Sequence, residues 1–507
     1  MPTRAEILPS FYQDSVVLMR IAGQVRAQAG VRQAAAFMGT PANHALLEQA
    51  RLATPETRRA RPEDLILTVD AETEAGAESA LAIARELLTG RRQAAETGAV
   101  LRPRTLDSAL KMLPAANLVV ISVPGAYAKF EAMRALKRGL HVFLFSDNVP
   151  VADEVELKQE AVKRHLLCMG PDCGTAYLNG TGVGFYNVVP KGRVGIVAAS
   201  GTGLQAVASR LAALGEGVSH GIGVGGRDLS AEVGGLMSLF AFESLANDPT
   251  TEAIILISKP PHPTVLSRLE AAMAKTEKPV VACVLGAAPP AESVARWVET
   301  LDAAADAMVA RLAKRRWMPR NFGDPGVTRA RLARLAPFRD SIGRDLLGLY
   351  TGGTLAHEAH LILDGLLGRD RPHRIIDLGD DEYTVSRPHP MIDPHIRSEM
   401  ILGAAASPEI GVLLVDLVLG RGAHPNPAEP LAEAIGKAGR RAEAAGRCLV
   451  AVASVVGTVQ DPQGLANQVK QLEEAGIAVF PTNAEAARFA ALLVKPELET
   501  SLLEGAR

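Results

Sequence analysis

This 507-residue sequence contains few cysteines and few aromatic residues. It also has no large excess of one charge and no long apolar runs. Only two of the four cysteines, Cys168 and Cys173, lie close together, and their spacing matches neither zinc ribbons nor redox motifs. Reduced thiols are therefore expected, as in a cytoplasmic protein. No stretch resembles a signal peptide or reaches the roughly 18 apolar residues that a membrane span needs. The sequence predicts a cytoplasmic protein that does not associate with membranes.

The charge balance also excludes classes of partner. A formal net charge of −2 gives no basic surface of the kind that binds nucleic acid or anionic lipid. Aromatic residues make up only 4% of the chain, and Ala, Leu, Val and Gly dominate, as is typical of α/β layers. The length exceeds what one hydrophobic core supports, so several domains are expected.

The order of apolar runs and helical patterns predicts four domains and a linker. Residues 1–92 alternate short strands and helices like a small α+β domain of the ACT or ferredoxin-like type. From residue 93 the pattern becomes β-α-β with nearly continuous apolar strands, which indicates parallel sheets covered on both faces. We predict a truncated Rossmann-like domain of the CoA-binding type at 93–190, and tandem flavodoxin-like domains at 191–310 and 346–500.

The segment between these two domains, 311–345, is rich in Lys and Arg. Such a run is usually a solvated linker. A dock for an acidic partner and an arm that binds nucleic acid are the alternatives, and the linker is the preferred interpretation.

Three glycine-rich turns follow predicted strands, at the edge where open parallel sheets bind ligands. Backbone N–H groups and the helix dipole favour anions there. Each turn alone could be only a tight connection, but three of them in a repeated scaffold indicate a phosphorylated or carboxylated ligand. The turns contain Ser200, Gly201 and Thr202; Gly225, Gly226 and Arg227; and Gly352, Gly353 and Thr354.

The most polar region of the sequence lies in the last domain, at 377–397 and 419–429. It supplies Arg387, His389, Arg397, Arg421 and His424 as candidates for carboxylate binding or proton transfer. His424 is a candidate nucleophile or acid/base, or else only caps the next helix. A surface loop with ion pairs is an equal alternative for the region. No metal is predicted, because the spacing of the carboxylates fits no metal motif and Mg²⁺ is not favoured.

Two groups of sequence phrases resemble known proteins. One group is similar to the α subunit of succinyl-CoA synthetase: "GRVGIVAASGTGLQAVASRL", "DPTTEAIILISKPP", "KPVVACVLGAAPP" and "MGPDCGT". The other resembles the carboxyl-terminal domain of its β subunit: "YTGGTLAHEA", "IIDLGDDE", "VLLVDLVLG" and "LEEAGIAVFPTNAEAARFAALLV". Fused without an ATP-grasp domain, and with "GDDEYTVSRPHPMIDP" and "GRGAHPNPA", the chain is similar to the FdrA family of acyl-CoA synthetase-like proteins.

The chain also departs from the synthetase pattern. The synthetase carries a phosphohistidine shortly after the strand that matches "KPVVACVLG", but no histidine occurs here between His262 and His357. Lys259 stands where the synthetase has the glutamate that holds this histidine, and a cation there attracts a phosphate or carboxylate directly. The β-α unit that binds the CoA pyrophosphate is not recognisable, so CoA remains only an alternative ligand.

Three hypotheses follow. The FdrA resemblance implies carbamoyl transfer between oxamate or oxalurate and phosphate in purine or allantoin breakdown, by an oligomer that includes separately encoded subunits. In this enzyme the first two turns would hold the phosphate of carbamoyl phosphate and Lys259 would neutralise it. The second hypothesis is an acyl-CoA ligase or CoA-transfer enzyme that relies on a partner for nucleotide chemistry. The third is a non-catalytic regulatory or scaffold subunit.

Overall fold

The computed structural model describes residues 2–11, 13, 15–96, 103, 105–368, 373–384 and 388–504. These residues form two compact units, Met1–Met112 with Asp381–Pro388, and Leu113–Asp380 with His389–Arg507. Each unit has a hydrophobic core of its own. No helix among the described residues has the length and apolar character needed to cross a membrane.

The first unit contains a three-stranded antiparallel sheet in the order β1-β3-β2. The central strand β3 is buried on both faces, because Leu65 and Leu67 pack with helices α1 and α3 while Ile66 packs on the other side with Leu47. This is the small α+β domain that the sequence predicts. Its elements are β1 (Thr3–Leu8), α1 (Ser15–Arg26), β2 (Val31–Met38), α2 (Pro41–Gln49), η1 (Thr57–Arg59), β3 (Leu65–Ala71), α3 (Glu74–Glu96) and α4 (Leu106–Met112).

The second unit begins with a short parallel sheet in the order β4-β5-β6. Its turn after β4 is closed, since a Cβ on Gly125 would overlap the backbone carbonyls of Asp147 and Asn148. This parallel sheet is the truncated Rossmann-like domain that the sequence predicts. The turn after β4 is not an open glycine-rich turn. Its elements are β4 (Leu118–Ile121), α5 (Gly125–Lys137), β5 (His141–Leu144), α6 (Val151–Lys163) and β6 (Cys168–Met169).

The next sheet has the strand order of a flavodoxin-like domain. Its parallel strands run β10-β9-β11-β12-β13, so the second strand along the chain precedes the first, and the hairpin β7-β8 extends the β10 edge. Strands β11 and β12 are buried along their whole length, as expected for strands covered by helices on both faces. The elements are β7 (Thr175–Leu178), β8 (Thr181–Gly184), β9 (Lys191–Ala198), α7 (Gly201–Ala213), β10 (Val218–Gly223), α8 (Leu236–Asn247), β11 (Ala253–Ser258), α9 (Pro263–Met273), β12 (Val280–Val284), β13 (Arg296–Val298) and α10 (Leu301–Leu312).

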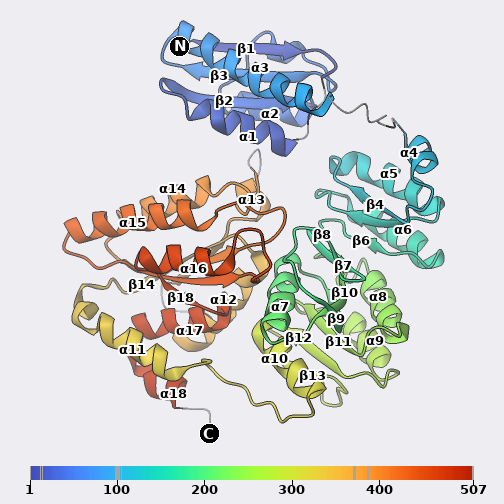
Figure 1. Ribbon diagram of the computed structural model, residues 1–507, viewed down its shortest axis with the longest axis vertical. Coiled ribbons are helices and arrows are strands. Elements are labelled where there is room, and N and C mark those ends of the chain that lie inside the picture. The colour runs from blue at the N-terminus through green and yellow to red at the C-terminus, as the bar shows by residue number, and fades with distance from the viewer. Residues whose placement is uncertain are drawn as a thin grey trace. The chain divides into compact units, whose positions relative to one another are not determined.

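The carboxyl-terminal sheet repeats this order as β15-β14-β16-β17-β18, with every neighbouring pair parallel. The prediction of tandem flavodoxin-like domains is confirmed (Figure 1). The elements are β14 (Asp345–Tyr350), α12 (Gly353–Leu367), β15 (His373–Asp377), α14 (His395–Ala404), β16 (Ile410–Val418), α15 (Ala428–Ala444), β17 (Val450–Val456), α16 (Leu465–Glu474), β18 (Ala478–Phe480), α17 (Asn483–Val494), η3 (Pro496–Leu498) and α18 (Glu499–Leu503). Helix α13 (Asp381–Thr384) interrupts this domain in the sequence and belongs to the first unit.

The two flavodoxin-like domains pack together through four helices. Helix α7 contacts α10 within the first domain, α12 contacts α17 within the second, and α7 also contacts α12 across the boundary. Buried side chains of both domains form one continuous hydrophobic cluster. The domains therefore meet as a single packed body, and any site between α7 and α12 belongs to both.

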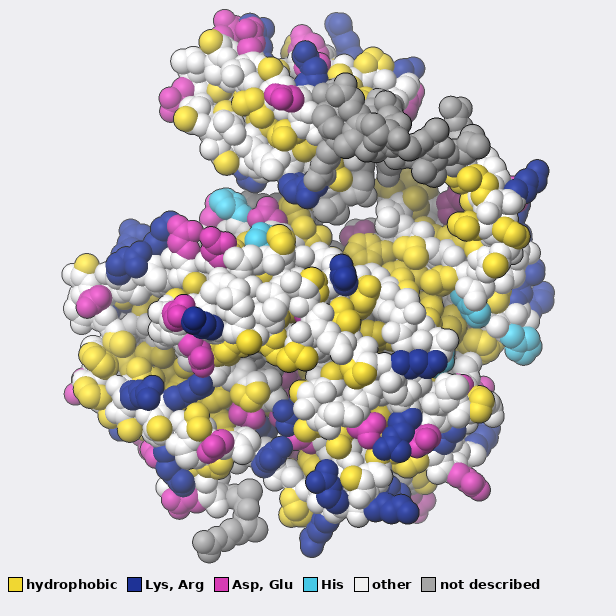
Figure 2. Space-filling model, viewed as in Figure 1, with side chains coloured by type: hydrophobic (Ala, Val, Ile, Leu, Met, Phe, Trp, Pro, Cys, Tyr) yellow, Lys and Arg dark blue, Asp and Glu magenta, His cyan; other side chains and the backbone are white. Residues whose placement is uncertain are grey.

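The basic segment between the two domains is packed against the second one rather than fully solvated. Helix α11 (Pro325–Leu335) presents Arg331, which donates to the carbonyl of Val479 and lies 4.7 Å above the Phe480 ring. Asn321 donates to the carbonyl of Leu502, and η2 (Ala336–Ser341) completes the connection. On the face drawn in Figure 2, coloured Lys and Arg side chains are interspersed with Asp and Glu.

Candidate functional site

The candidate site lies where helices α7 and α12 begin. Ser200 is the N-cap of α7, and its Oγ accepts the N–H of Gly203 at 2.8 Å. The same Oγ lies 2.5 Å from Oγ1 of Thr354 at the start of α12. Gly352, the N-cap of α12, lies so close to Thr202 that an added Cβ would be 2.9 Å from its methyl carbon. The two helix N-termini therefore converge, and each contributes about half a positive charge to the same region.

A further hydroxyl lies beside the start of α7. Oγ1 of Thr175, on β7, is 3.4 Å from the position that a Cβ on Gly201 would occupy. This oxygen is buried and has no hydrogen-bond partner among the described residues. Buried hydroxyls are normally paired, so Thr175 is a ready donor or acceptor at this helix end. We call Ser200, Thr202, Thr354, Thr175 and the two helix N-termini the helix-start site.

Asp377, at the end of β15, closes one side of the helix-start site. Its carboxylate lies against Gly353, where a Cβ would overlap Oδ2, and its Oδ1 accepts the N–H of Gly379 at 2.9 Å. Only glycine at 353 leaves room for this approach. Burial raises the pKa of Asp377, whereas the nearby ammonium of Lys259 lowers it in part. Asp377 is therefore a candidate proton donor or acceptor.

His389 faces the same point as Asp377. A Cβ added to Gly379 would lie 2.8 Å from Nε2 of His389 and 3.2 Å from Oδ1 of Asp377. Nδ1 of His389 accepts the N–H of Met391 at 3.2 Å, which assigns the proton of the neutral ring to Nε2. Burial lowers the pKa of His389 to about 4. His389 therefore presents a neutral N–H donor at neutral pH.

Asp416 holds the turn that leads into α12. This fully buried carboxylate accepts the N–H groups of Thr351 at 2.7 Å and Gly352 at 2.8 Å. Arg397, only 2% exposed, donates to the carbonyl of Asp416 at 2.6 Å and lies 3.3 Å from its carboxylate. Arg397 thus pairs with the carboxylate that holds this turn.

Lys259 and His357, far apart in the sequence, lie close enough in the fold for the charge of Lys259 to act on His357. Lys259 is exposed at the end of β11. Burial lowers the pKa of His357, the charge of Lys259 lowers it further, and a hydrogen bond with the backbone of Leu285 opposes both. Leu285 directly follows β12, the strand after which the synthetase carries its phosphohistidine. Helix α12 therefore places His357 beside the loop in which this sequence has no histidine.

The second glycine-rich turn has a different environment. Arg227 donates to the carbonyl of Val149 at 2.8 Å and pairs with Glu154 at 3.0 Å. Glu154 and Asp228 both bind the fully buried ammonium of Lys158 at 2.7 Å. Gly225 adopts a φ of +86°, and a Cβ added to it would lie 3.2 Å from Cα of Gly170, whereas a Cβ on Gly226 would meet no atom within 4 Å. This turn joins α6 to the first flavodoxin-like domain. None of these contacts involves a residue of the helix-start site.

The remaining predicted residues lie on neighbouring loops or outside the described chain. Arg421 is exposed, and its backbone pairs with that of Tyr186. His424 donates its backbone N–H to Met391 at 2.8 Å, and its Nδ1 accepts the N–H of Asn426. The His424 loop is thus joined to the His389 loop by a backbone hydrogen bond. Arg387 lies outside the described residues.

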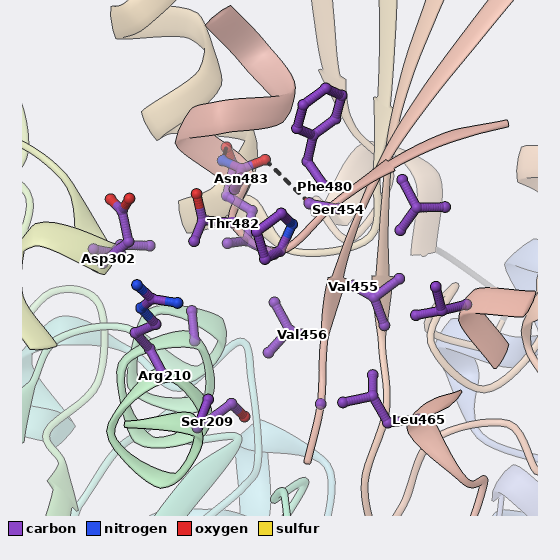
Figure 3. A pocket seen from close by; sticks show the side chains of 18 of the residues that line it. Ser209, Arg210, Asp302, Ser454, Val455, Val456, Leu465, Phe480, Thr482 and Asn483 are labelled. Atoms are coloured by element: carbon purple, nitrogen blue, oxygen red, sulfur yellow. Dashed lines mark hydrogen bonds between the residues drawn. The ribbon is translucent and has the colours of Figure 1, made fainter. Parts of the chain in front are cut away.

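A cavity of about 340 Å³ lies between the two flavodoxin-like domains (Figure 3). Its walls are mainly apolar, and Arg210, Asp302 and Asn483 line its polar side. Glu358 on α12 accepts N–H groups from Leu301 and Asn483 there. Burial, and then the charge of Asp302, raise the pKa of Glu358 to about 7.

Comparison with known proteins agrees with this architecture. A family model described as "CoA-ligase" matches residues 349–493, and a model described as "AllF, heavy metal-associated domain" matches residues 1–103. The chain is 40% identical to the uncharacterized protein YahF of Escherichia coli (strain K12) over 94% of its own length and 96% of that protein. The chain belongs to the YahF family.

More distant relatives of this YahF-family chain are α subunits of succinate–CoA ligase (ADP-forming). It is 29% identical to the subunit from Methanothermobacter thermautotrophicus and 30% identical to that from Aquifex aeolicus. Each match covers 34% of the chain, and 59% and 58% of the respective subunits. The chain thus has a succinyl-CoA synthetase-like scaffold and spans less than two thirds of these subunits.

The family descriptions imply CoA and a heavy metal as bound groups, and the described residues fit neither. All four cysteines lie beyond residue 103, and Nε2 of His44 lies 3.0 Å from the carbonyl of Ala60, so residues 1–103 offer no thiolate set for a soft metal. The backbone carbonyls of Asp147 and Asn148 lie against Gly125, so the described residues show no open glycine-rich turn after β4 of the kind that binds a CoA pyrophosphate. We therefore assign no step to either group.

Proposed function

We propose that this chain is the subunit of an FdrA-type carbamoyltransferase that binds carbamoyl phosphate, and that the helix-start site holds its phosphate. The single observation that carries the proposal is the convergence of the α7 and α12 N-termini at Ser200 and Thr354, 2.5 Å apart. Two dipoles and several hydroxyls directed at one point favour an anion with many acceptor oxygens. The AllF description of the amino-terminal match supports a role in the same breakdown pathway that the FdrA resemblance implies.

The proposed reaction is the phosphorolysis of a carbamoyl compound such as oxalurate, or its reverse. A phosphate oxygen attacks the carbamoyl carbon, the bond from this carbon to the amide nitrogen breaks, and the nitrogen takes up a proton. The products are carbamoyl phosphate and oxamate, so atoms and charge balance. Separately encoded subunits and a second copy of the chain are part of this proposal.

Residues of the site have distinct roles in the proposal. The helix starts and the Ser200 and Thr354 hydroxyls bind the phosphoryl oxygens, and Lys259 offsets their charge. The Nε2–H of His389 donates to the carbamoyl oxygen as negative charge develops on it. Asp377, with its raised pKa, carries the proton that the leaving nitrogen needs. Arg421 and His424 on the adjacent loop contact the carboxylate of the acceptor.

Binding and turnover test the proposal separately. Titration of the whole chain with carbamoyl phosphate, acetyl phosphate or inorganic phosphate should show saturable binding that weakens in Lys259→Ala. Lys275→Ala is the matched control, because Lys275 is an exposed lysine on the same domain, just beyond α9. Phosphorolysis of oxalurate should appear when the partner subunits are added. The proposal is wrong if no acyl phosphate binds and no carbamoyl compound is cleaved.

The position of His357 favours a second candidate, an acyl-CoA ligase or CoA-transfer enzyme that receives its phosphoryl group from a partner. Incubation with labelled ATP or acetyl phosphate would then give an acid-labile, base-stable phosphoenzyme. Loss of the label in His357→Asn, with retention in His424→Asn, would support this candidate; the opposite pattern would assign the label to His424. Absence of label in the wild-type protein would exclude it.

A further inference from the structure

We propose that His360, Asp364 and His373 form a binding site for a divalent transition-metal ion, of which Zn²⁺ is the best fit. The site joins the carboxyl end of α12 to the start of β15 and is separate from the helix-start site. Gly353 and His360 are seven residues apart on one helix, which places the new site about 10 Å further along α12. The proposal does not depend on the proposed function.

The three side chains already converge. One ligand atom from each lies within 4.8 Å of those of the other two. Nε2 of His373 is 2.9 Å from Oδ1 of Asp364, and Nε2 of His360 is 3.5 Å from Oδ2 of the same carboxylate. Ligands bound tetrahedrally to Zn²⁺ at 2.0–2.2 Å are separated by about 3.3 Å. Small rotations of the side chains therefore suffice to surround an ion.

The backbone fixes two of the ligands relative to each other. His360 and Asp364 are four residues apart on α12 and so occupy one face of the helix. His373 begins β15, and its side chain is only 3% exposed, whereas that of His360 is 51% exposed. The buried histidine provides a rigid ligand, and the exposed one leaves a path from solvent to the ion.

Local electrostatics also favour a cation at this position. Asp364 lies in the last turn of α12, where the helix dipole contributes about half a negative charge. Nδ1 of His373 is buried and has no hydrogen-bond partner among the residues that the structure describes.

The ligand types select the class of ion. Two imidazole nitrogens and one carboxylate suit Zn²⁺, Co²⁺ or Ni²⁺, whereas Mg²⁺ and Ca²⁺ prefer oxygen ligands throughout. Three protein ligands leave at least one coordination position for water.

Calorimetric titration of the chelator-treated full chain with ZnCl₂ tests the proposal. We expect one ion per chain with a micromolar or tighter Kd, and d–d absorption bands of a histidine-ligated ion when CoCl₂ is used instead. His360→Ala and Asp364→Asn should each weaken binding about 100-fold or more, because each removes a ligand outright. His360 is exposed, so its replacement is not expected to impair folding.

His395→Ala is the matched control. His395 also forms an i,i+4 pair with a carboxylate, Glu399, at 3.2 Å and with similar exposure, but no second histidine joins it among the described residues. Its replacement should leave Zn²⁺ binding unchanged. The proposal is overturned if the wild-type chain binds no Zn²⁺, if His360→Ala binds it equally well, or if His395→Ala abolishes binding. Circular dichroism of each variant confirms that loss of binding does not reflect unfolding.

Discussion

Oγ of Ser200 lies 2.5 Å from Oγ1 of Thr354, so that the first turns of two helices from different flavodoxin-like domains share a hydrogen bond. Each hydroxyl follows the first parallel strand of its flavodoxin-like sheet, β9 or β14. The two domains therefore contribute equivalent turns to one site. An anion bound there would contact both domains at once.

Replacement of Ser200 by Ala should weaken both folding and anion binding. Loss of the N-cap is expected to cost about 1 kcal/mol of unfolding free energy. Thr482→Ala is the control, because Thr482 caps α17 in the same way, through the N–H of Glu485. Denaturant titration should show similar losses for both variants, whereas calorimetry with carbamoyl phosphate should show weaker binding only for Ser200→Ala. Equal affinity in the two variants would exclude Ser200 from the site.

Two glycines of α12 should respond to alanine in opposite directions. A Cβ on Gly353 would overlap the carboxylate of Asp377, so Gly353→Ala should destabilise the protein and displace this side chain. Gly365 has no neighbouring atom within 4 Å of an added Cβ, so Gly365→Ala should stabilise the helix by about 0.5–1 kcal/mol. Thermal unfolding of the two variants measures the difference. A stabilising Gly353→Ala would contradict the arrangement of Asp377.

Arg227 and Lys259 should separate into a structural and a ligand-binding residue. Arg227 pairs with Glu154 and with a carbonyl, so Arg227→Ala should reduce the unfolding free energy and leave acyl-phosphate affinity unchanged. Lys259→Ala should have the reverse effect, because the exposed Lys259 side chain makes no packing contribution to the core. Comparing unfolding curves with binding isotherms checks both. Reduced affinity in Arg227→Ala would instead place the phosphate at the second glycine-rich turn.

Breaking the buried pair between Asp416 and Arg397 should be strongly destabilising. Asp416→Ala leaves the guanidinium of Arg397 buried without a counter-charge, and the expected cost is about 3–5 kcal/mol. The double variant Asp416→Ala, Arg397→Met removes the unpaired charge as well and should recover part of this loss. A double-mutant cycle measured by urea unfolding gives the coupling energy. Additive losses would contradict a direct interaction.

His389 should make the protein less stable in mild acid. Burial lowers the pKa of His389 from 6.5 to about 4, so the unfolded chain binds a proton more readily than the folded one. The stability that the neutral His389 ring contributes to the folded protein is fully present above pH 6.5 and is lost as the pH falls toward 4. The loss reaches at most about 3 kcal/mol, because the side chain keeps some solvent contact. His389→Phe should flatten the unfolding free energy over this range, and an unchanged pH profile would contradict the assignment.

The sequence by itself determined the local backbone and the class of fold. The apolar run that ends at Ala198 and the glycine-rich turn at Ser200 predicted the strand and turn found as β9 and the start of α7. The repeated spacing of buried strands predicted two flavodoxin-like sheets, and both have the expected strand order. These features depend on neighbouring residues and on periodicity, which a single sequence displays.

Only the tertiary structure decided which polar side chains meet. Arg227 and Arg397 look like anion-binding residues in the sequence, yet each is paired with a carboxylate, in contacts formed by distant segments. Asp377 could not be distinguished among the many charges around it until the fold placed it against Gly353. His357 lies beside Leu285 because α7 and α12 pack across the domain boundary. Such pairings depend on how two complete domains dock, and no local pattern encodes that geometry.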